Sequence, residues 1–348
     1  MFQQEQSKTE LKQLGEFGLI NHLTSTIRLQ NTSSIKGVGD DAAVIRQHEK
    51  DLLVSTDMLL EGIHFDLTYV PLKHLGYKAA VVNFSDIYAM NGKPEQLTVA
   101  LACSNRFPLE AIEQIYEGLL LACNEYGVDL VGGDTASSKA GLLLSLTIIG
   151  AVEPGKAVYR SGAKTGDLIV VSGDLGGAYM GLQLLEREKA VFMETPGAQP
   201  DLQGFDYILQ RQLRPEARRD VVEFLAENAI QPNAMIDISD GLSSEILHLC
   251  TQSNTGCRVF EDKLPIDPTT VNLAREFEID PTVCALNGGE DYELLFTLPQ
   301  EHFEKIRNCP LLSIIGYITD TPNEHLLVDK SGNTHHLTAQ GWNAFEKK

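Results

Sequence analysis

The chain has 348 residues, of which 43% are hydrophobic, and a formal net charge of −20. This length suits two domains of ordinary size. The acidic balance argues against nucleic acid and anionic membranes as partners, because both attract basic patches. No run of 18 apolar residues is present, the N-terminal stretch lacks the apolar core of a signal peptide, and no Cys-x-x-Cys pair occurs. We therefore expect a cytoplasmic protein with reduced cysteines and no membrane span.

Strands and helices alternate through the first part of the chain. Apolar runs predict strands at 51–56, 97–103, 129–131 and 142–152, and apolar residues at helical spacing predict helices at 75–90 and 108–126. In the first of these helices, Asn83 and Asp86 lie three residues apart, so we expect one helix face to carry both polar groups. A Glu-Pro-Gly-Lys turn at 153–156 then indicates a boundary.

The second part of the chain starts a new series of elements. Strands are predicted at 168–172, 234–238, 292–298, 312–319, 326–328 and 334–337, and helices at 178–187, 215–228 and 242–251. The segment 194–204, which contains proline and glycine, is predicted to be a surface insertion. The pattern favours two α/β or α+β halves joined near residue 155.

Short motifs that contain aspartate recur where apolar runs stop or helices end. They are Gly37-Val-Gly-Asp-Asp41, Ser55-Thr-Asp57, Asn83-Phe-Ser-Asp86, Gly132-Gly-Asp134, Asp237-Ile-Ser-Asp240 and Gly288-Gly-Glu-Asp291. Carboxylates at such positions can converge, and two unit charges about 4 Å apart repel by roughly 4 kcal/mol at an effective dielectric near 20. A converged set therefore needs cations, and Mg²⁺ is the natural partner because it takes hard oxygen ligands and shares them with phosphates. The pattern indicates a Mg-nucleotide enzyme.

Each motif also has an ordinary structural explanation. Asp240 could be a helix N-cap, although that would leave Asp237 unexplained. Arg160 could be a solvated loop residue or could hold phosphate oxygens. His64 could be structural or could contact a substrate phosphate. Trp342 could anchor the C-terminal segment or stack on a cationic ring.

Familiar phosphate-binding motifs are missing. The sequence contains neither Gly-x-x-x-x-Gly-Lys-Ser/Thr nor the protein-kinase His-Arg-Asp set. A nucleotide enzyme with this sequence must hold phosphates by another device. The paired Gly132 and Gly133 would let backbone N–H groups approach a phosphate closely.

The ordered set of motifs resembles the thiamine-monophosphate kinase family of the aminoimidazole-ribotide-synthetase-like ATP-binding superfamily. The matching stretches are the segments 37–44, 55–65, 78–90, 132–135, 160–164, 237–242 and 288–294. They occur in the order typical of the family and cover nearly the whole chain.

The resemblance implies an aminoimidazole-ribotide-synthetase-like fold with two domains. An N-terminal α/β domain, 1–153, would carry the acidic Mg/ATP turns, and its sheet would pair with its twin across a homodimer. A C-terminal α+β domain, 154–348, would complete the ATP and substrate cleft. The implied reaction is ATP-dependent phosphorylation of thiamine monophosphate to thiamine diphosphate with several Mg²⁺ ions.

The resemblance also assigns roles to individual residues. Positions that match Mg²⁺ ligands are Asp41, Ser55, Thr56, Asp57, Asp86, Asp134, Asp237 and Asp240. Positions that match ATP contacts are Gly133, Asp134, Arg160, Ser239 and, in addition, Tyr116. Positions that match the surroundings of thiamine monophosphate are His64, Glu290 and Trp342. No protein nucleophile or general base is expected.

Three other functions are consistent with the same acidic motifs. The first is a sister synthetase that acts on a ribotide or makes selenophosphate, although Cys103, the first cysteine, lies far from the N-terminus, where the latter usually carries a reactive one. The second is a Mg-dependent phosphohydrolase. The third is a nucleotide sensor without catalytic activity.

Overall fold

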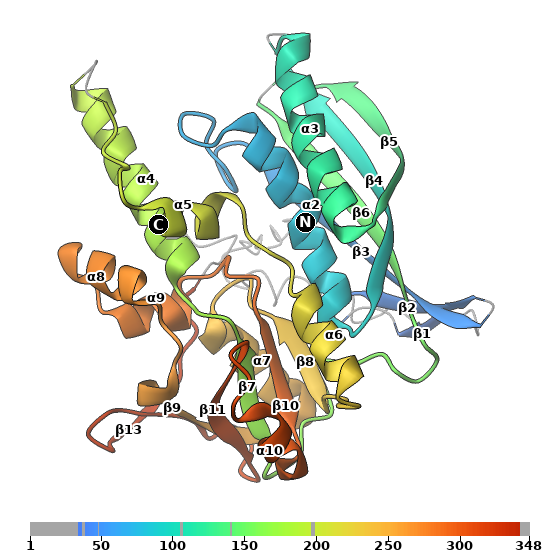
Figure 1. Ribbon diagram of the computed structural model, residues 1–348, viewed down its shortest axis with the longest axis vertical. Coiled ribbons are helices and arrows are strands. Elements are labelled where there is room, and N and C mark those ends of the chain that lie inside the picture. Colours follow the sequence, from blue (N-terminus) through green and yellow to red (C-terminus); the bar gives the residue numbers. More distant parts are fainter. Residues whose placement is uncertain are drawn as a thin grey trace, which may run out of the picture.

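The computed structural model describes residues 34–36, 39–47, 49–104, 107–139, 141–195 and 199–341. These residues form two β-sheets with helices packed between and around them (Figure 1). The mixed arrangement confirms the predicted fold class. Residue 153 lies between the last strand of the first sheet and the first strand of the second along the chain, and we retain 1–153 and 154–348 as proposed domains.

The N-terminal sheet has six strands in the order β1-β2-β3-β6-β4-β5. They are β1 (Ser34–Lys36), β2 (Ala43–Gln47), β3 (Lys50–Leu60), β4 (Lys93–Cys103), β5 (Asp129–Ser137) and β6 (Leu143–Val152). β4 and β5 pair in parallel, whereas the other neighbouring strands pair antiparallel. Among the described residues the sheet ends at β5, one edge of which has no partner strand.

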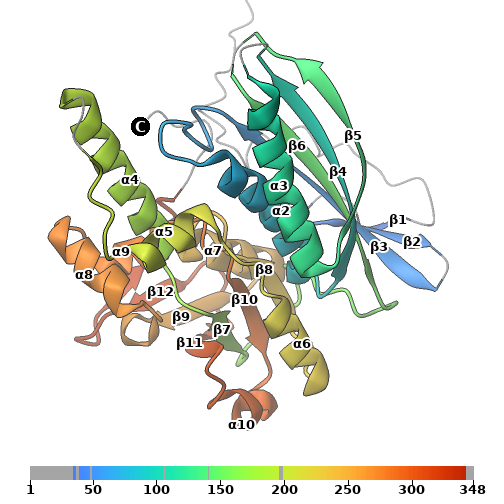
Figure 2. The same cartoon turned by 45° about the horizontal axis from the view of Figure 1, so that its top comes forward.

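Two helices, α2 (Leu72–Ala89) and α3 (Leu109–Tyr126), cover one face of this sheet (Figure 2). Leu53 of β3 is fully buried in the core beneath them, whereas Met58 is 52% exposed and Thr56 is exposed as well. Successive side chains of a strand point to opposite faces. The alternation thus buries one face and leaves the other face open.

Helix α2 lies between the N-terminal sheet and the C-terminal half of the protein (Figure 1). Most of its residues are buried, on all sides of the helix. It approaches α3 very closely, because a Cβ atom on Gly76 would lie 1.9 Å from the Ile115 carbonyl oxygen and one on Gly118 would lie 1.9 Å from the Lys73 carbonyl oxygen. Backbone of one helix fills the space that a side chain of the other would need.

Substitution of Gly118 by alanine should therefore separate the two helices and destabilise the fold. The added methyl group would meet backbone rather than a flexible side chain, so we expect a loss of about 1–3 kcal/mol in the free energy of unfolding. Chemical denaturation would measure it. The control is Glu113→Ala on the exposed side of α3. A Gly118→Ala protein as stable as this control would contradict the close approach.

The C-terminal sheet has seven strands in the order β13-β12-β9-β11-β7-β10-β8. They are β7 (Leu168–Ser172), β8 (Ala234–Asp237), β9 (Gly256–Phe260), β10 (Leu294–Leu298), β11 (Leu312–Thr319), β12 (His325–Val328) and β13 (Thr334–His336). All residues of β8 and β10 are buried, as expected for strands covered on both faces.

The helices of the C-terminal half are α4 (Gly177–Glu194), α5 (Asp206–Leu213), α6 (Arg219–Glu227), α7 (Leu242–Ser253), α8 (Pro268–Glu276), α9 (Pro281–Asn287) and α10 (Phe303–Ile306). α4, α5, α8 and α9 pack against one another in an apolar cluster of their own, whereas α6 and α7 pack against the sheet. Ile169 of β7 belongs to the same apolar cluster as Ile246 of α7, whereas its neighbour Val170 belongs to the cluster that contains Leu225 of α6. The alternation along β7 thus assigns α7 and α6 to opposite faces.

Two strands continue through residues that were predicted to be turns. Asp57 lies within β3, which pairs with β6 from Asp51 to Leu60. The Gly132-Gly-Asp134 motif lies within β5, where Asp134 pairs with Ala100 of β4. Hydrogen bonding to the neighbouring strand keeps both segments extended, so the prediction of strand-end turns was wrong at these two motifs.

Other differences concern the ends of elements and short elements. α4 continues to Glu194 rather than ending near 187, and α6 begins at Arg219 rather than at 215. The strands β1, β2 and β9 and the helices α5, α8 and α9 were not predicted. Among the described helices, none has the length and apolarity needed to cross a membrane, and all six cysteines are free.

Candidate active site

A cleft of about 1220 Å³ lies between the two halves of the protein. It is lined by most of the predicted site residues, namely Asp41, Ser55, Asp57, His64, Asp86, Arg160, Asp237, Ser239, Asp240 and Glu290. These residues come from β3, α2 and the loop between them, from the end of β8 and the turn after it, and from the loops before β2, β7 and β10. The sequence-based expectation that acidic motifs from both halves converge is thus met for this group.

Three carboxylates form the centre of the site. Asp41 lies just before β2, Asp86 near the end of α2 and Asp237 at the end of β8, and one oxygen of each lies within 4.8 Å of one oxygen of the others. Two serines hold them in place: the Ser55 hydroxyl donates to Asp86 Oδ2 at 2.6 Å, and the Ser85 hydroxyl donates to Asp237 Oδ2 at 2.6 Å. Ser85 and Asp86 are neighbours on α2, so this helix holds the Asp237 carboxylate and supplies the Asp86 carboxylate.

Burial and mutual repulsion oppose ionisation of these acids. Burial, followed by the charge of Asp41, raises the pKa of Asp57 to about 6. Burial and Asp41 also raise the pKa of Asp237 to about 7, against the opposing effects of the Ser85 hydrogen bond and of Arg160. The pKa of Asp86 lies well above its ordinary range, first because of burial and then because of Asp57 and Asp237.

Arg160 is the cation nearest to the three carboxylates among the described contacts. Its guanidinium pairs with Asp41, and its backbone N–H donates to Asp40 Oδ1 at 2.6 Å. Successive side chains of an extended segment point to opposite sides. The two adjacent aspartates accordingly have different roles: Asp40 fixes the loop, and Asp41 faces the cluster. One guanidinium leaves most of the negative charge at the site uncompensated.

The donor set suits a hard divalent cation. Asp41 Oδ2 is buried without a hydrogen-bond partner among the described residues, and the surrounding donors are carboxylate and hydroxyl oxygens. Mg²⁺ takes oxygen ligands of this kind and commonly shares them with phosphates. Asp41, Asp86 and Asp237 therefore fit a magnesium ion, with Asp57 and Ser55 beside them.

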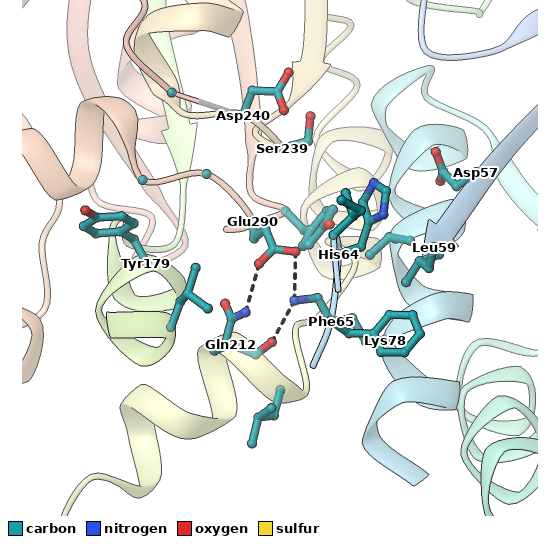
Figure 3. A pocket seen from close by; sticks show the side chains of 18 of the residues that line it. Asp57, Leu59, His64, Phe65, Lys78, Tyr179, Gln212, Ser239, Asp240 and Glu290 are labelled. Carbon is teal, nitrogen blue, oxygen red and sulfur yellow. Dashed lines mark hydrogen bonds and ion pairs between the residues drawn. The ribbon is translucent and has the colours of Figure 1, made fainter. Parts of the chain in front are cut away.

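The Asp237–Asp240 segment forms the turn between β8 and α7. The helix N-cap is Gly241, and no side chain caps α7, so the alternative that Asp240 is an N-cap is wrong. Instead, the Asp240 N–H donates to the buried Glu245 at 3.0 Å. Ser239 and Asp240 thereby line the cleft (Figure 3).

Glu290, from the loop before β10, lines the same cleft as Asp57 of β3 (Figure 3). Its carboxylate accepts a hydrogen bond from Gln212 and forms an ion pair with Lys78. His64 also lines the cleft, and its Nδ1 lies 3.1 Å from the Leu60 backbone nitrogen.

Several predicted residues lie elsewhere. The Thr56 hydroxyl donates to the Leu146 carbonyl oxygen at 2.7 Å on the open face of the sheet. Gly133 and Asp134 lie on the edge strand β5, three strands from β3, which corresponds to roughly 14 Å at the usual strand spacing. Tyr116 of α3 does not line the cleft. Trp342 lies outside the described residues.

Of the two polar residues expected to share one face of α2, Asp86 lines the cleft and Asn83 does not. Asn83 is fully buried, and its Nδ2 donates to the Ala79 carbonyl oxygen at 2.9 Å. Ser85, which holds Asp237, and Lys78, which pairs with Glu290, were not identified as site residues. Both are polar residues on the largely apolar buried part of the helix, and that signal could have marked them.

Comparisons with known proteins agree with this geometry. Residues 39–152 match the family described as AIR synthase related protein, N-terminal domain. The thiamine-monophosphate kinase of Aquifex aeolicus (strain VF5) is 36% identical over 293 residues, which cover 84% of this chain and 89% of that protein. The thiamine-monophosphate kinase of Bacillus subtilis (strain 168) is 33% identical over 339 residues, which cover 96% and 100%.

The chain belongs to the thiamine-monophosphate kinase family. A solved structure of AaThiL complexed with AMPPCP and TMP has a TM-score of 0.82 and 33% sequence identity, and the alignment covers 97% of this chain and 100% of that one. The hydrogenase maturation protein HypE in complex with ATP, at 20% identity and a TM-score of 0.68, shares the fold. Members of this kinase family therefore share both sequence and overall structure with the chain.

The raised pKa values predict how stability depends on pH in the metal-free protein. An acid whose pKa is higher in the folded state stabilises the fold below its ordinary pKa and loses that contribution as pH rises through the raised value. For Asp57 and Asp237, whose raised pKa values are about 6 and about 7, stability should fall between about pH 4 and pH 8 by at most about 7 kcal/mol, of which about 3 kcal/mol comes from Asp57 and about 4 kcal/mol from Asp237. Excess MgCl₂ should reverse the loss at the upper end of this range.

Denaturant unfolding with and without MgCl₂ would test this expectation. Asp237→Asn should make the metal-free protein more stable at the upper pH and should reduce the stabilisation by MgCl₂. Asp262→Asn, at a largely exposed surface position, is the control. If the metal-free stability did not change with pH, or if MgCl₂ stabilised Asp237→Asn as much as the unsubstituted protein, the carboxylate cluster would not be a cation site.

Proposed function

We propose that this protein transfers the γ-phosphoryl group of ATP to the phosphate of thiamine monophosphate, giving thiamine diphosphate and ADP. The observation that carries the proposal is the convergence of Asp41, Asp86 and Asp237 from both halves of the protein in one cleft. Members of the family are named for this substrate, and AaThiL has been solved with AMPPCP and TMP. The cleft has room for two phosphate-bearing ligands.

The chemistry requires alignment and charge compensation more than proton transfer. The acceptor is a phosphate that is already ionised near neutral pH, so no general base is needed, and we infer a direct in-line transfer without a phospho-enzyme. Mg²⁺ would neutralise charge on the phosphates when bound. The chain itself holds the carboxylates in fixed positions through Ser55 and Ser85 and places Arg160 at their edge.

Most of the residues proposed to bind metal or substrate line the cleft, whereas Thr56, Gly133, Asp134 and Tyr116 lie outside the cleft of their own chain. The proposed Mg²⁺ ligands, several of which act through nucleotide phosphates, are Asp41, Ser55, Thr56, Asp57, Asp86, Asp134, Asp237 and Asp240. Arg160, Ser239, Gly133, Asp134 and Tyr116 are proposed to contact ATP, and His64, Glu290 and Trp342 to surround thiamine monophosphate. The free cysteines support a reducing, cytoplasmic location.

We also infer that the active form is a homodimer. The open face of the N-terminal sheet exposes Met58 and Val131, which are 52% and 57% exposed, and the edge strand β5 carries Gly133 and Asp134 far from the cleft of its own chain. A second copy that covers this face would bury the apolar side chains. It would also bring its own β5 toward the cleft of the first copy.

Product analysis tests the proposed reaction. The protein incubated with MgATP and thiamine monophosphate should form thiamine diphosphate and ADP, and Asp57→Asn should lower turnover by about a hundredfold or more, because aligned charge compensation at the transferring group is lost. Thermal stability should not fall, because the substitution removes a carboxylate whose ionisation burial opposes. Release of free phosphate without thiamine diphosphate would favour a phosphohydrolase. Unchanged turnover of Asp57→Asn at limiting Mg²⁺ would contradict the metal assignment.

Hybrid dimers test whether Asp134 acts across the dimer interface. A dimer with Asp134→Asn in one subunit and Asp237→Asn in the other would keep one intact site if Asp134 serves the partner's cleft, and about half of the wild-type activity should remain. If Asp134 serves its own cleft, both sites would be damaged. Co-expressed subunits with different affinity tags would provide the hybrid. The controls are the two homodimers in which both subunits carry the same single substitution. An inactive hybrid would exclude the exchange.

A further inference from the structure

A buried lysine lines the cleft next to the carboxylate Glu290. Lys78 on α2 has only 8% of its surface exposed. A buried ammonium group is costly unless it is paired and hydrogen-bonded. Its position in the wall of the cleft, rather than in the apolar core, indicates that it is retained for an interaction within the cleft.

Lys78 and Gln212 hold Glu290 by both of its carboxylate oxygens (Figure 3). Lys78 Nζ lies 3.0 Å from Glu290 Oε1 and donates to the Gln212 carbonyl oxygen at 2.9 Å. Gln212 Nε2 donates to Glu290 Oε2 at 2.9 Å. The three residues come from α2, α5 and the loop before β10, so the carboxylate is fixed by two separate elements.

The backbone of Glu290 is fixed as well. Its φ of 57° lies in the left-handed region, which is uncommon for a residue with a side chain, and follows Gly289 with φ 72°. The Glu290 N–H donates to the Ser239 carbonyl oxygen at 2.6 Å. A strained backbone of this kind persists where the surrounding structure holds it, and such positions are frequent at ligand sites.

Helix α2 connects this carboxylate to the acidic cluster. Lys78, Val82 and Asp86 follow one another at four-residue spacing, and all three line the cleft. At 1.5 Å per residue, Lys78 and Asp86 are about 12 Å apart along the helix axis. An extended thiamine monophosphate can therefore place its phosphate near Asp86 and its aminopyrimidine ring near Glu290.

We propose that Lys78 and Gln212 are positioning residues that aim the Glu290 carboxylate at the amino group of the aminopyrimidine ring of thiamine monophosphate. This inference rests on the proposed function. Each carboxylate oxygen can accept more than one hydrogen bond, so both remain available to the amino group after they bind Lys78 and Gln212. Fixing the acceptor in advance lowers the ordering cost when the substrate binds.

Steady-state kinetics of Lys78→Met, Glu290→Gln and the double variant test the proposal. Lys78→Met should raise KM for thiamine monophosphate about tenfold, because a charge-assisted contact is lost, and should leave KM for ATP within about twofold. In the Glu290→Gln background, Lys78→Met should add little further increase, because the lysine acts through the glutamate. A role in folding alone would not give this selective and non-additive effect.

The preference for the amino group provides a second readout. The protein should use thiamine monophosphate better than the analogue in which oxygen replaces the ring amine, and Lys78→Met should reduce that preference. Gln212→Met removes one hydrogen bond to Glu290 without removing a charge. It should also raise KM for thiamine monophosphate and reduce the preference for the amine, and it replaces Lys78→Met in the test if that variant does not fold. The matched control is Lys73→Met, also on α2, where the Lys73 side chain pairs with Glu117 of α3 at the surface.

The outcomes separate this inference from the proposed function. If the unsubstituted protein forms no thiamine diphosphate, the proposed function fails whatever the variants do. If it does form the product while Lys78→Met and Gln212→Met keep its KM for thiamine monophosphate and its preference for the amine, the positioning role is overturned alone. Equal increases in KM for both substrates, or fully additive effects of Lys78→Met and Glu290→Gln, would also overturn it.

Discussion

The site depends on like charges that the fold forces together. Asp41, Asp86 and Asp237 approach within 4.8 Å, although two such charges at about 4 Å repel by roughly 4 kcal/mol at an effective dielectric near 20. Hydrogen bonds from Ser55 and Ser85 offset part of this cost. The rest must be met by protons or by cations. A protein that keeps such a cluster at neutral pH is stabilised by the ions that accompany a phosphate ligand.

Helix α2 is the element that makes this arrangement possible. It is buried between the N-terminal sheet and the C-terminal half, and its close approach to α3 fixes its position. The same helix contributes Asp86 to the cluster, holds Asp237 through Ser85 and holds Glu290 through Lys78. The two ends of the cleft therefore lie at a separation set by a rigid helix rather than by loops. The cost of ordering the site is met largely during folding, before any ligand binds.

Sequence reasoning predicted the parts of the site that depend on local chemistry. Aspartates placed where strands and helices end are brought together when those ends converge, and Asp41 and Asp237 follow this rule. Sequence reasoning failed where pairing with a distant strand decides the conformation. β5 continues through Gly132-Gly-Asp134 because β4 supplies its hydrogen bonds. It also missed Lys78, whose partner Glu290 lies more than 200 residues away in the chain, so no local pattern could connect them.

Apart from Tyr116 of α3, the described residues that were predicted for the site and lie outside the cleft share one location. Thr56, Gly133 and Asp134 lie on the open face or the free edge of the N-terminal sheet. An edge strand that has no partner strand within the described part of the chain, together with exposed apolar side chains such as Met58 and Val131, favours association with another chain. A second copy bound there would satisfy that edge and bury that face. In our proposed dimer, each cleft is completed by the neighbouring chain. This arrangement explains both the exposed face of the sheet and the position of Thr56, Gly133 and Asp134 outside the cleft of their own chain.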